Sequence, residues 1–184
     1  MFDYIDGIDL YQFMELRNFT VLSELEMKNL FRQLVTILIE IHALGVAHMD
    51  LKLENIMISK QSDKRLSVHL IDFGLSQIGK PSGSTKFSGS LEYACPEVLL
   101  RRKYSPFRAD IYSLGIILYT LACGAFPYTQ DDLVDFMHLT APWPTMYFPD
   151  YVSSQAQDLI SKITSFRAEN RLSLEEILEH PFLN

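Results

Sequence analysis

One stretch of the sequence, residues 48–74, concentrates polar side chains that can do chemistry: Asp50, Lys52, Asn55 and Asp72. A carboxylate can accept a proton or bind a hard cation, and an amide oxygen can complete a cation site. The ammonium group of a lysine can neutralise negative charge nearby. To act in one reaction, these side chains must be held together by the surrounding helices and strands.

The elements expected around this stretch are mostly helices. Ser23 and Glu26 form a capping-box pattern, and apolar residues then recur at intervals of three and four up to Leu44. A long helix is therefore predicted from there to a left-handed stop at Gly45. Further helices are predicted at 9–17, 108–123, 131–138, 154–165 and 173–180, the last two opening at Ser154 and Ser173. The β-prone runs 55–59 and 66–71 predict a two-stranded ribbon.

Length and composition predict one globular unit. At 184 residues and 48% hydrophobic, the chain can bury one sizeable core. The expected elements make its fold class mainly α with a small β ribbon. The apolar run 111–123 contains Ser113 and Gly115 and is too short to cross a bilayer. It predicts a buried core helix, and no membrane partner is expected.

Charge and cysteine content argue against several classes of protein. A formal net charge of -7 offers no electrostatic basis for nucleic acid binding, and the basic triplet 101–103 is expected in a solvated loop. Cys95 and Cys123 are too few for a disulfide framework and lack zinc-site spacing. No secretory signal is visible near Met1. We therefore expect reduced thiols in an intracellular protein of the cytoplasm or nucleus.

The spacing from His48 through Asp50, Lys52 and Asn55 to Asp72 resembles the catalytic loop and metal-binding turn of protein kinases. This resemblance implies that Asp50 accepts the proton of the substrate hydroxyl and that Lys52 steadies the γ-phosphate of ATP. It also implies that Asn55 and Asp72 bind Mg²⁺ through oxygen atoms. Taken alone, Asp50 reads equally well as an ordinary loop aspartate, so the joint spacing carries the interpretation.

Further landmarks of the same family follow in order. Residues 90–97 resemble the end of the kinase activation segment, and residues 110–115 resemble the start of the buried central helix. The resemblance implies that Asp110 braces the backbone of the catalytic loop and that Glu97 pairs with Arg171. It covers essentially the whole chain as a protein-kinase-like C-terminal lobe: a hinge-like segment at 1–8, then the lobe at 9–184, with the catalytic loop at 48–55 and the activation segment at 72–97.

Details of these motifs favour the serine/threonine branch of the family. Lys52 in the catalytic loop and Ser90 in the activation segment are similar to the Snf1/AMPK-related and calmodulin-kinase-like groups. The implied partner is a protein substrate with a serine or threonine acceptor. Glu54 and Asp9 fall where the resemblance puts contacts to basic residues upstream of the acceptor or, for Asp9, to the ribose. Both acids read equally well as solvated surface residues.

The resemblance implies that adenine lies against the backbone from Asp3 to Ile5 and on Met57. The sequence carries no glycine-rich loop, strand lysine or helix glutamate, which kinases use to clamp ATP. Three explanations stay open: a fragment or mis-assigned start of a full kinase, a truncated relative unable to transfer phosphate, or a lobe completed by another chain. The exposed face is expected to bind ATP weakly at best and to favour aggregation or a covering partner.

A non-catalytic interaction module is the alternative function. The joint presence of Asp50, Lys52, Asn55 and Asp72 argues for catalysis, because a scaffold has no physical need for all four side chains. An upstream reading frame that encodes the glycine-rich loop and strand lysine would favour a mis-assigned start. A stop codon there would favour the module.

Met49 stands where regulated kinases carry an arginine that pairs with a phosphate on the activation loop. Methionine cannot form that charge-assisted bond. The usual phosphorylated threonine aligns with Lys86, one residue after Thr85. Any activity is therefore expected to be independent of phosphorylation of this loop.

Overall fold

The computed structural model describes residues 4–60, 66–79 and 89–184. Helices dominate this part of the chain: α1 (Leu10–Leu16), α2 (Glu24–Ala43), α3 (Pro96–Leu99), α4 (Pro106–Cys123), α5 (Gln130–Met137), α6 (Ser154–Ile163) and α7 (Leu174–Leu178). Short 3₁₀ turns form at η1 (Leu53–Asn55), η2 (Leu91–Tyr93) and η3 (Ala168–Asn170). The strands are β1 (Gly7–Asp9), β2 (Val46–Ala47), β3 (Ile56–Lys60), β4 (Leu66–Leu70) and β5 (Gln77–Ile78). The helix-rich fold class is as predicted.

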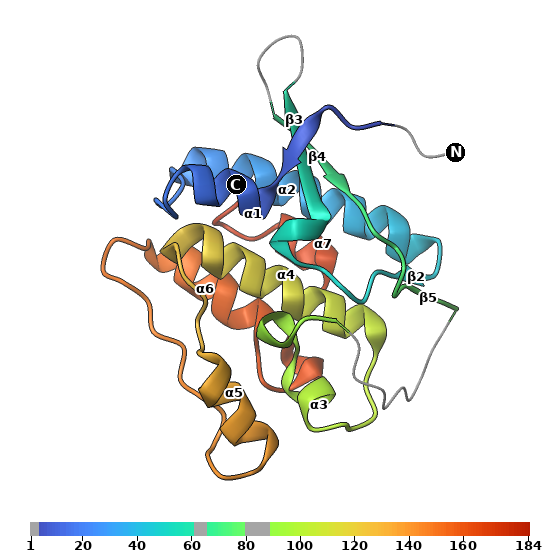
Figure 1. Cartoon of the computed structure of the whole chain (residues 1–184), viewed down its shortest axis with the longest axis vertical. Coiled ribbons are helices and arrows are strands. Elements are labelled where there is room, and N and C mark those ends of the chain that lie inside the picture. The colour runs from blue at the N-terminus through green and yellow to red at the C-terminus, as the bar shows by residue number, and fades with distance from the viewer. Residues whose placement is uncertain (1–3, 61–65, 80–88) are drawn as a thin grey trace.

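The elements are arranged around α4. Figure 1 shows the sheet of β1, β3 and β4 at the top of the view, α4 across the middle, and α3 and α5 at the bottom. Helix α2 packs against both β4 and α4, and α6 covers another side of α4. The chemically rich segment 48–55 runs from β2 into η1, directly before β3. It therefore lies where the sheet meets the helical body.

The predicted two-stranded ribbon is wrong in extent, because β1 adds a third strand to β3 and β4. All pairs are antiparallel, with Ile8 opposite Ile58 and Ile58 opposite Val68. Gly7 permits this pairing, since a Cβ atom there would collide with the Ile58 carbonyl. A second sheet of β2 and β5 was also not predicted. Strands of two or three residues have no usable periodicity, so tertiary pairing decides them.

Most helix ends follow their predicted local chemistry. The capping box of α2 is confirmed, because Ser23 Oγ accepts from the Glu26 N–H and Glu26 Oε2 accepts from the Ser23 N–H. Gly45 follows this helix with a φ of 75°, in the left-handed region expected. The cap of α6 is Ser153 rather than the predicted Ser154. Adjacent serines offer the same hydroxyl, and only the backbone geometry distinguishes them.

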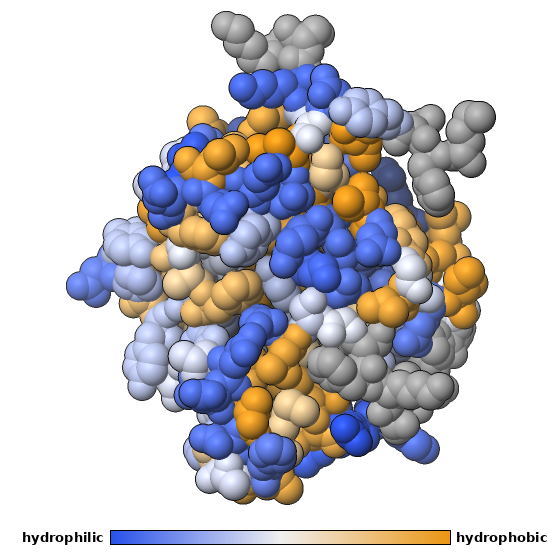
Figure 2. All heavy atoms as spheres, in the orientation of Figure 1, coloured by the Kyte–Doolittle hydropathy of each residue, from blue (hydrophilic) through white to orange (hydrophobic). Residues whose placement is uncertain are grey.

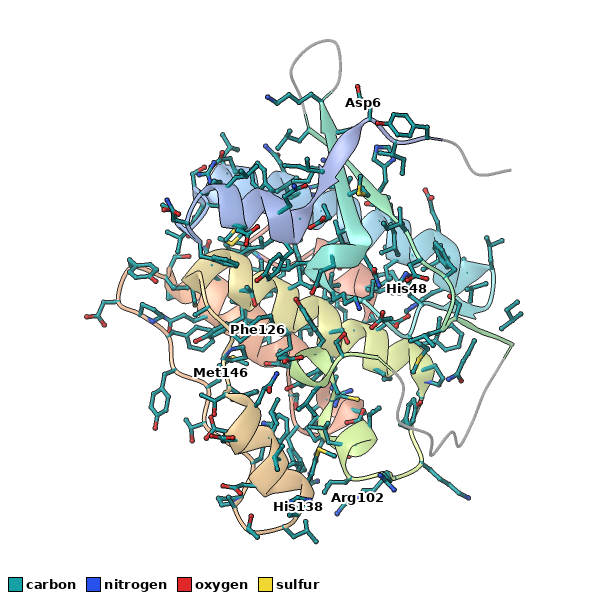
Figure 3. The ribbon with its side chains drawn as sticks, viewed as in Figure 1. Asp6, His48, Arg102, Phe126, His138 and Met146 are labelled. Carbon is teal, nitrogen blue, oxygen red and sulfur yellow. The ribbon has the colours of Figure 1, made fainter. Side chains whose placement is uncertain are left out.

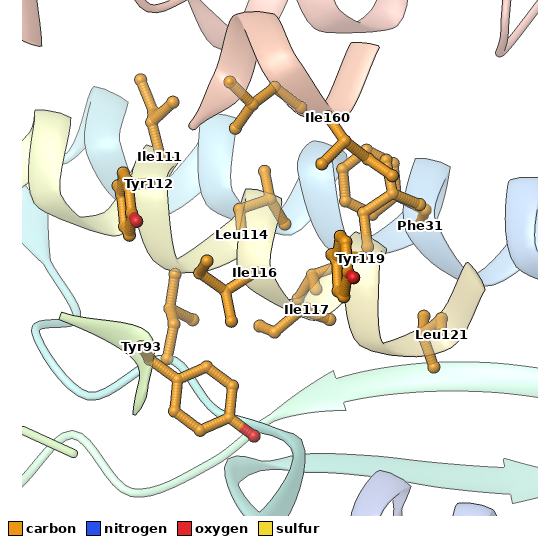
Figure 4. Packing of buried hydrophobic residues seen from close by; sticks show 14 of the residues in the cluster. Phe31, Tyr93, Ile111, Tyr112, Leu114, Ile116, Ile117, Tyr119, Leu121 and Ile160 are labelled. Atoms are coloured by element: carbon orange, nitrogen blue, oxygen red, sulfur yellow. The ribbon is translucent and has the colours of Figure 1, made fainter. Parts of the chain in front are cut away.

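The hydrophobic core is centred on α4, in agreement with the buried helix predicted there. Leu114, Ile116 and Ile117 have no solvent exposure. Figure 4 shows the side chains of α4 packed between those of α2 and α6. Gly115 permits the close approach of α6, since a Cβ there would lie 2.6 Å from Thr164 Cγ2. None of the helices in the described ranges is both long enough and apolar enough to cross a membrane.

Candidate active site

The backbone that precedes Asp50 is held by a buried carboxylate from α4. Asp110 is 1% exposed, and its Oδ2 and Oδ1 atoms accept hydrogen bonds from the N–H groups of His48 and Met49, at 2.7 Å and 2.8 Å. This is the brace that the resemblance implied. Met49 has a φ of 69°, which is unfavourable for a side chain of its size. The two bonds from its own and the preceding amide stabilise this turn.

His48 connects this loop to the segment that leads to Asp72. Its Nε2 atom lies 2.9 Å from the Ile71 carbonyl oxygen, and its Nδ1 atom accepts from the Asp50 N–H at 3.3 Å. A carbonyl can only accept, so the ring carries its proton on Nε2. The ring also packs edge-on against Phe73, with centroids 4.9 Å apart. Figure 3 shows His48 below the sheet and close to the N-terminal end of α4.

Asp50 is the centre of a hydrogen-bonded cluster. Its carboxylate is 3.1 Å from Lys52 Nζ and 3.0 Å from Asn55 Nδ2, and it accepts from Ser90 Oγ at 3.4 Å. Asn55 Nδ2 also donates to the Asp50 carbonyl oxygen at 2.8 Å. Lys52 Nζ donates to Ser90 Oγ at 3.3 Å. The fold thus brings together an acid, an ammonium group, an amide and a hydroxyl from two distant segments.

The chain around Ser90 packs against residues 48–55 through contacts that involve no charged group. A Cβ atom on Gly89 would lie 2.9 Å from the Met49 carbonyl oxygen, and Gly89 has a φ of 96°. Tyr93 OH accepts from the Leu53 N–H at 3.3 Å, and burial raises the pKa of this phenol. A small cavity of about 20 Å³ remains beside Asp50, lined in part by Gly89 and Tyr93. Residues 80–88, including Thr85 and Lys86, lie outside the described residues.

Asp72 stands in a very different environment. It is exposed, has a φ of 60°, and its Oδ1 atom accepts one hydrogen bond, at 3.1 Å, from the Gly74 N–H. In the described residues, no group of three or more His, Cys, Asp or Glu side chains is arranged to bind a metal ion. Mg²⁺ bound to phosphate groups needs only one or two protein oxygens, the rest being water and phosphate.

The chain at Glu97, at the start of α3, is joined to the helical body by a buried ion pair with Arg171. Arg171 NH1 and NH2 lie 2.6 Å and 2.7 Å from the two carboxylate oxygens of Glu97, a bidentate arrangement. Burial alone would lower the pKa of Arg171, but the hydrogen bonds and charge of Glu97 outweigh it and raise the pKa. The guanidinium also stacks over Tyr112, 5.0 Å from the ring centroid. The contact implied by the resemblance is therefore present.

Comparison with known proteins gives the family. The model of the protein kinase domain matches residues 1–183 of the 184. The chain belongs to the protein kinase family. The resemblance to its serine/threonine branch, near the Snf1/AMPK-related kinases, is confirmed by the relatives.

Three fungal relatives illustrate the likeness. Protein kinase kin1 of Schizosaccharomyces pombe is 34% identical over 184 residues, which cover 100% of this chain and 20% of kin1. The probable serine/threonine-protein kinase HSL1 of Saccharomyces cerevisiae is 32% identical over 98% of this chain and 12% of HSL1. Serine/threonine-protein kinase ppk25 of S. pombe is 32% identical over 100% of this chain and 42% of ppk25. The kinase chain thus spans less than half of each of these relatives.

Of the residues predicted to contact nucleotide, Asp9 and Met57 lie on the sheet of β1, β3 and β4, and Ile5 lies just before it. Met57 is half-buried on β3, opposite Asp9 of β1, and Ile5 is half-buried just before β1. Asp9 caps α1, because its Oδ1 atom accepts from the Gln12 N–H at 2.8 Å. Figure 2 shows hydrophobic side chains at the surface along this sheet. Asp3 lies outside the described residues.

Glu54 and Met49 are the remaining residues of this region for which the sequence made predictions. Glu54 is exposed on η1, one residue before Asn55, so its carboxylate is accessible to solvent. Met49 is buried at 7% exposure, so its side chain packs in the core beneath the loop.

His42, which the sequence pattern did not indicate, lies 2.9 Å from Asp110 through its Nε2 atom. Its only sequence signal is a place in the last turn of α2, which does not reveal a partner on α4.

Proposed function

We propose that this chain provides the C-terminal catalytic lobe of a serine/threonine protein kinase, which transfers the γ-phosphate of ATP to a serine or threonine of a protein substrate. In this proposal residues 1–8 form the hinge and residues 9–184 the lobe, with the catalytic loop at 48–55 and the activation segment at 72–97. The observation that carries the proposal is the cluster of Asp50, Lys52, Asn55 and Ser90. Phosphoryl transfer relies mainly on positioned charges, and this cluster is built from them.

Asp50 is the residue proposed to accept the proton of the substrate hydroxyl. Its carboxylate is 9% exposed and is oriented from two sides by Asn55 Nδ2 and Ser90 Oγ. A general base must be held within hydrogen-bonding reach of the proton it accepts. Lys52, 3.1 Å from Asp50, is placed to stabilise negative charge on the transferred phosphate in the same small volume.

Asn55 and Asp72 are proposed to hold Mg²⁺. The Asn55 amide nitrogen is engaged by Asp50, which leaves its oxygen, Oδ1, as the atom able to face a cation. Asp72 presents an exposed carboxylate with one local hydrogen bond, from Gly74. Oxygen donors of these two kinds fit a hard cation. When bound, Mg²⁺ would neutralise charge on the phosphates of ATP.

The nucleotide and substrate contacts are further parts of the proposal. Adenine and ribose are assigned to the sheet near Ile5, Asp9 and Met57, where apolar side chains reach the surface, and to Asp3, which lies outside the described residues. A basic residue upstream of the acceptor is assigned to the exposed carboxylate of Glu54, because opposite charges attract there. The accessible apolar surface beside the sheet also supports a protein partner that covers this face.

The decisive experiment is a phosphorylation assay on the longest reading frame that contains the chain. Asp50→Asn keeps the shape of the side chain but removes most of its basicity, and we expect activity to fall by about a thousandfold. Asp150→Asn, an exposed change outside the cluster, is the matched control and is expected to retain activity. Equal phosphate transfer by wild type and Asp50→Asn would refute the catalytic role.

The same assay distinguishes the alternative function. A wild-type protein that transfers no phosphate, yet binds a partner through the sheet face, would be a non-catalytic module. Calorimetry on residues 1–184 adds an independent measurement, in which weak or undetectable binding of Mg-ATP is expected. Micromolar affinity of these residues alone would contradict that expectation.

A further inference from the structure

Three consecutive cations, Arg101, Arg102 and Lys103, are exposed between α3 and α4 and are called here the basic turn. In the described part of the chain, none of these three side chains takes part in an ion pair. Figure 3 shows Arg102 near the lower end of the molecule, away from the sheet at the top. The chain carries a formal net charge of -7, so the basic turn is a local exception in an acidic protein.

The backbone of the basic turn is fixed by the end of α3. The Arg101 N–H donates to the Val98 carbonyl oxygen at 3.0 Å. The Arg102 N–H donates to the Glu97 carbonyl oxygen at 2.9 Å. These two bonds form a Schellman motif, in which the residue after the helix cap takes a left-handed conformation. That residue is Arg101, with a φ of 51°, so the turn has a defined structure.

An arginine is an unfavourable residue at this left-handed position. Glycine has no Cβ, adopts a positive φ without steric cost and is the usual residue there. The same chain places Gly45 after α2 and Gly124 after α4, at φ values of 75° and 72°. Attraction between a cation and the end of α3 does not require Arg101, because Arg102 and Lys103 also supply it. Since glycine would favour stability here, the Arg101 side chain points to a role in binding.

The basic turn also rests on a rigid base. Leu99 before it and Tyr104 after it are 2% and 5% exposed, so both ends of the turn are anchored in the core. Glu97 of α3 forms the buried bidentate ion pair with Arg171. Binding at this turn therefore requires little ordering of the backbone, which lowers its entropic cost.

The number and type of the cations select the class of partner. Arginine binds phosphate oxygens through paired N–H donors, and a phosphate group carries nearly two charges and three acceptor oxygens. One phosphate can therefore contact more than one cation of the basic turn. Recognition of an anionic membrane takes a larger cluster, of about four to eight basic residues. The net charge of -7 opposes binding to nucleic acid. Three cations on a short turn fit a phosphorylated protein segment better than either.

We propose that the basic turn is a docking surface for a phosphorylated segment of a partner protein. The guanidinium groups of Arg101 and Arg102 and the ammonium group of Lys103 supply the donors, and the anchored end of α3 holds them at the surface. No residue of the turn belongs to the cluster around Asp50. Binding at this surface therefore does not depend on the proposed function.

Fluorescence anisotropy on the 184-residue chain tests the binding directly. The probe is a labelled peptide of alanine and glycine that carries a pair of phosphoserines, and its unphosphorylated form is the reference. Arg102→Ala is expected to weaken binding of the probe by about tenfold, because one charged donor is lost. Replacement of all three cations by alanine is expected to abolish binding. The affinity should also fall as salt is added, and the reference peptide should not bind.

Lys60→Ala is the matched control, because Lys60 is an exposed cation at the end of β3, in the sheet at the other end of the molecule. Its affinity for the probe is expected to equal that of wild type. Absence of binding by wild type, unchanged affinity in the triple variant, or an equal loss in Lys60→Ala would overturn the proposal. Binding to phosphatidylserine vesicles without binding to the probe would also overturn it, because the turn would then recognise membranes.

Arg101→Gly separates binding from folding. Relief of the left-handed strain should raise Tm by about 2–4 °C. The same change should weaken binding of the probe by about tenfold, because a guanidinium group is lost. Thermal unfolding and anisotropy on the same sample measure both effects. A lower Tm, or wild-type affinity in this variant, would contradict the assignment of Arg101 to binding.

Discussion

Asp50 and Asp72 are the two carboxylates assigned to the reaction, and their surroundings are opposite. Asp50 is 9% exposed and contacts Lys52, Asn55 and Ser90. Asp72 is exposed, and its carboxylate accepts one hydrogen bond, from a residue two positions away. The first is held both by its own loop and by Ser90, 40 residues away, whereas the second is held by its own turn.

This difference follows from what each carboxylate would have to do. A base acts best when its position is fixed before the substrate arrives, since no reorganisation is then needed during the reaction. A metal ligand must stay open to its cation and to water. The contacts of Asp50 therefore contribute to the stability of the fold, whereas the single contact of Asp72 leaves its carboxylate available to a cation. Substitutions in the two regions should differ in their effects on stability and on phosphate transfer.

The largest expected effect concerns the response to metal. Asp50→Asn should reduce phosphate transfer by about a thousandfold at every Mg²⁺ concentration, because the lost proton acceptor is not replaced by a cation. Asp72→Asn should also reduce transfer, but part of the loss should be recovered as Mg²⁺ rises, because a neutral oxygen remains as a weaker ligand. A titration of Mg²⁺ in a kinase assay measures both. Recovery of Asp50→Asn by Mg²⁺ would contradict these assignments.

Stability should show the same contrast between the cluster around Asp50 and the exposed Asp72. Asn55→Ala removes two hydrogen bonds to Asp50 and leaves a buried carbonyl oxygen unpaired, so we expect a loss of about 1–3 kcal/mol. Asp72→Asn keeps a side chain that tolerates the left-handed backbone and should change stability by less than about 0.5 kcal/mol. Urea unfolding at neutral pH measures the two variants side by side. Similar losses would mean that burial of the cluster is not what stabilises the loop.

Two glycines provide a sharper version of this contrast. Gly89→Ala would place a Cβ 2.9 Å from the Met49 carbonyl at a φ of 96°, so a loss of about 1–3 kcal/mol is expected. Gly74→Ala would place a Cβ 3.0 Å from Asp72 Oδ1, the end of an exposed side chain that can move away. Its cost should stay below about 1 kcal/mol. Thermal unfolding of both variants tests the order, and a larger loss at Gly74 would reverse it.

The smallest expected effect concerns Glu26, a partly exposed carboxylate held mainly within its own turn, as Asp72 is. The hydrogen bond from Ser23 is the main reason that the pKa of Glu26 lies below its usual 4.5. A lowered pKa in the folded state contributes stability above the unfolded pKa, and this contribution is lost as pH falls through the folded pKa. The free energy of unfolding should therefore fall below about pH 4.5, and less steeply in Ser23→Ala. Urea unfolding at several pH values measures both slopes, and identical slopes would contradict the expectation.

Much of this protein could be predicted from local sequence. The Ser23 capping box, the stop at Gly45 and the buried helix α4 depend on side chains within a few residues of each other. The types and spacing of Asp50, Lys52, Asn55 and Asp72 were sufficient to indicate the family. These features share one physical basis: hydrogen bonds and apolar periodicity that are complete within a single segment.

Only the tertiary structure decided how those segments meet. Strand β1 exists because Gly7 allows the backbone to approach β3, and Ser90 reaches Asp50 across 40 residues of chain. The hydrogen bond between His42 and Asp110 joins residues 68 positions apart, on two helices whose individual patterns predict their burial but not this contact. Such contacts depend on the packing of whole elements, and a buried carboxylate accepts whichever donors the packing brings to it. Local sequence determined which groups are present, and packing determined which of them act together.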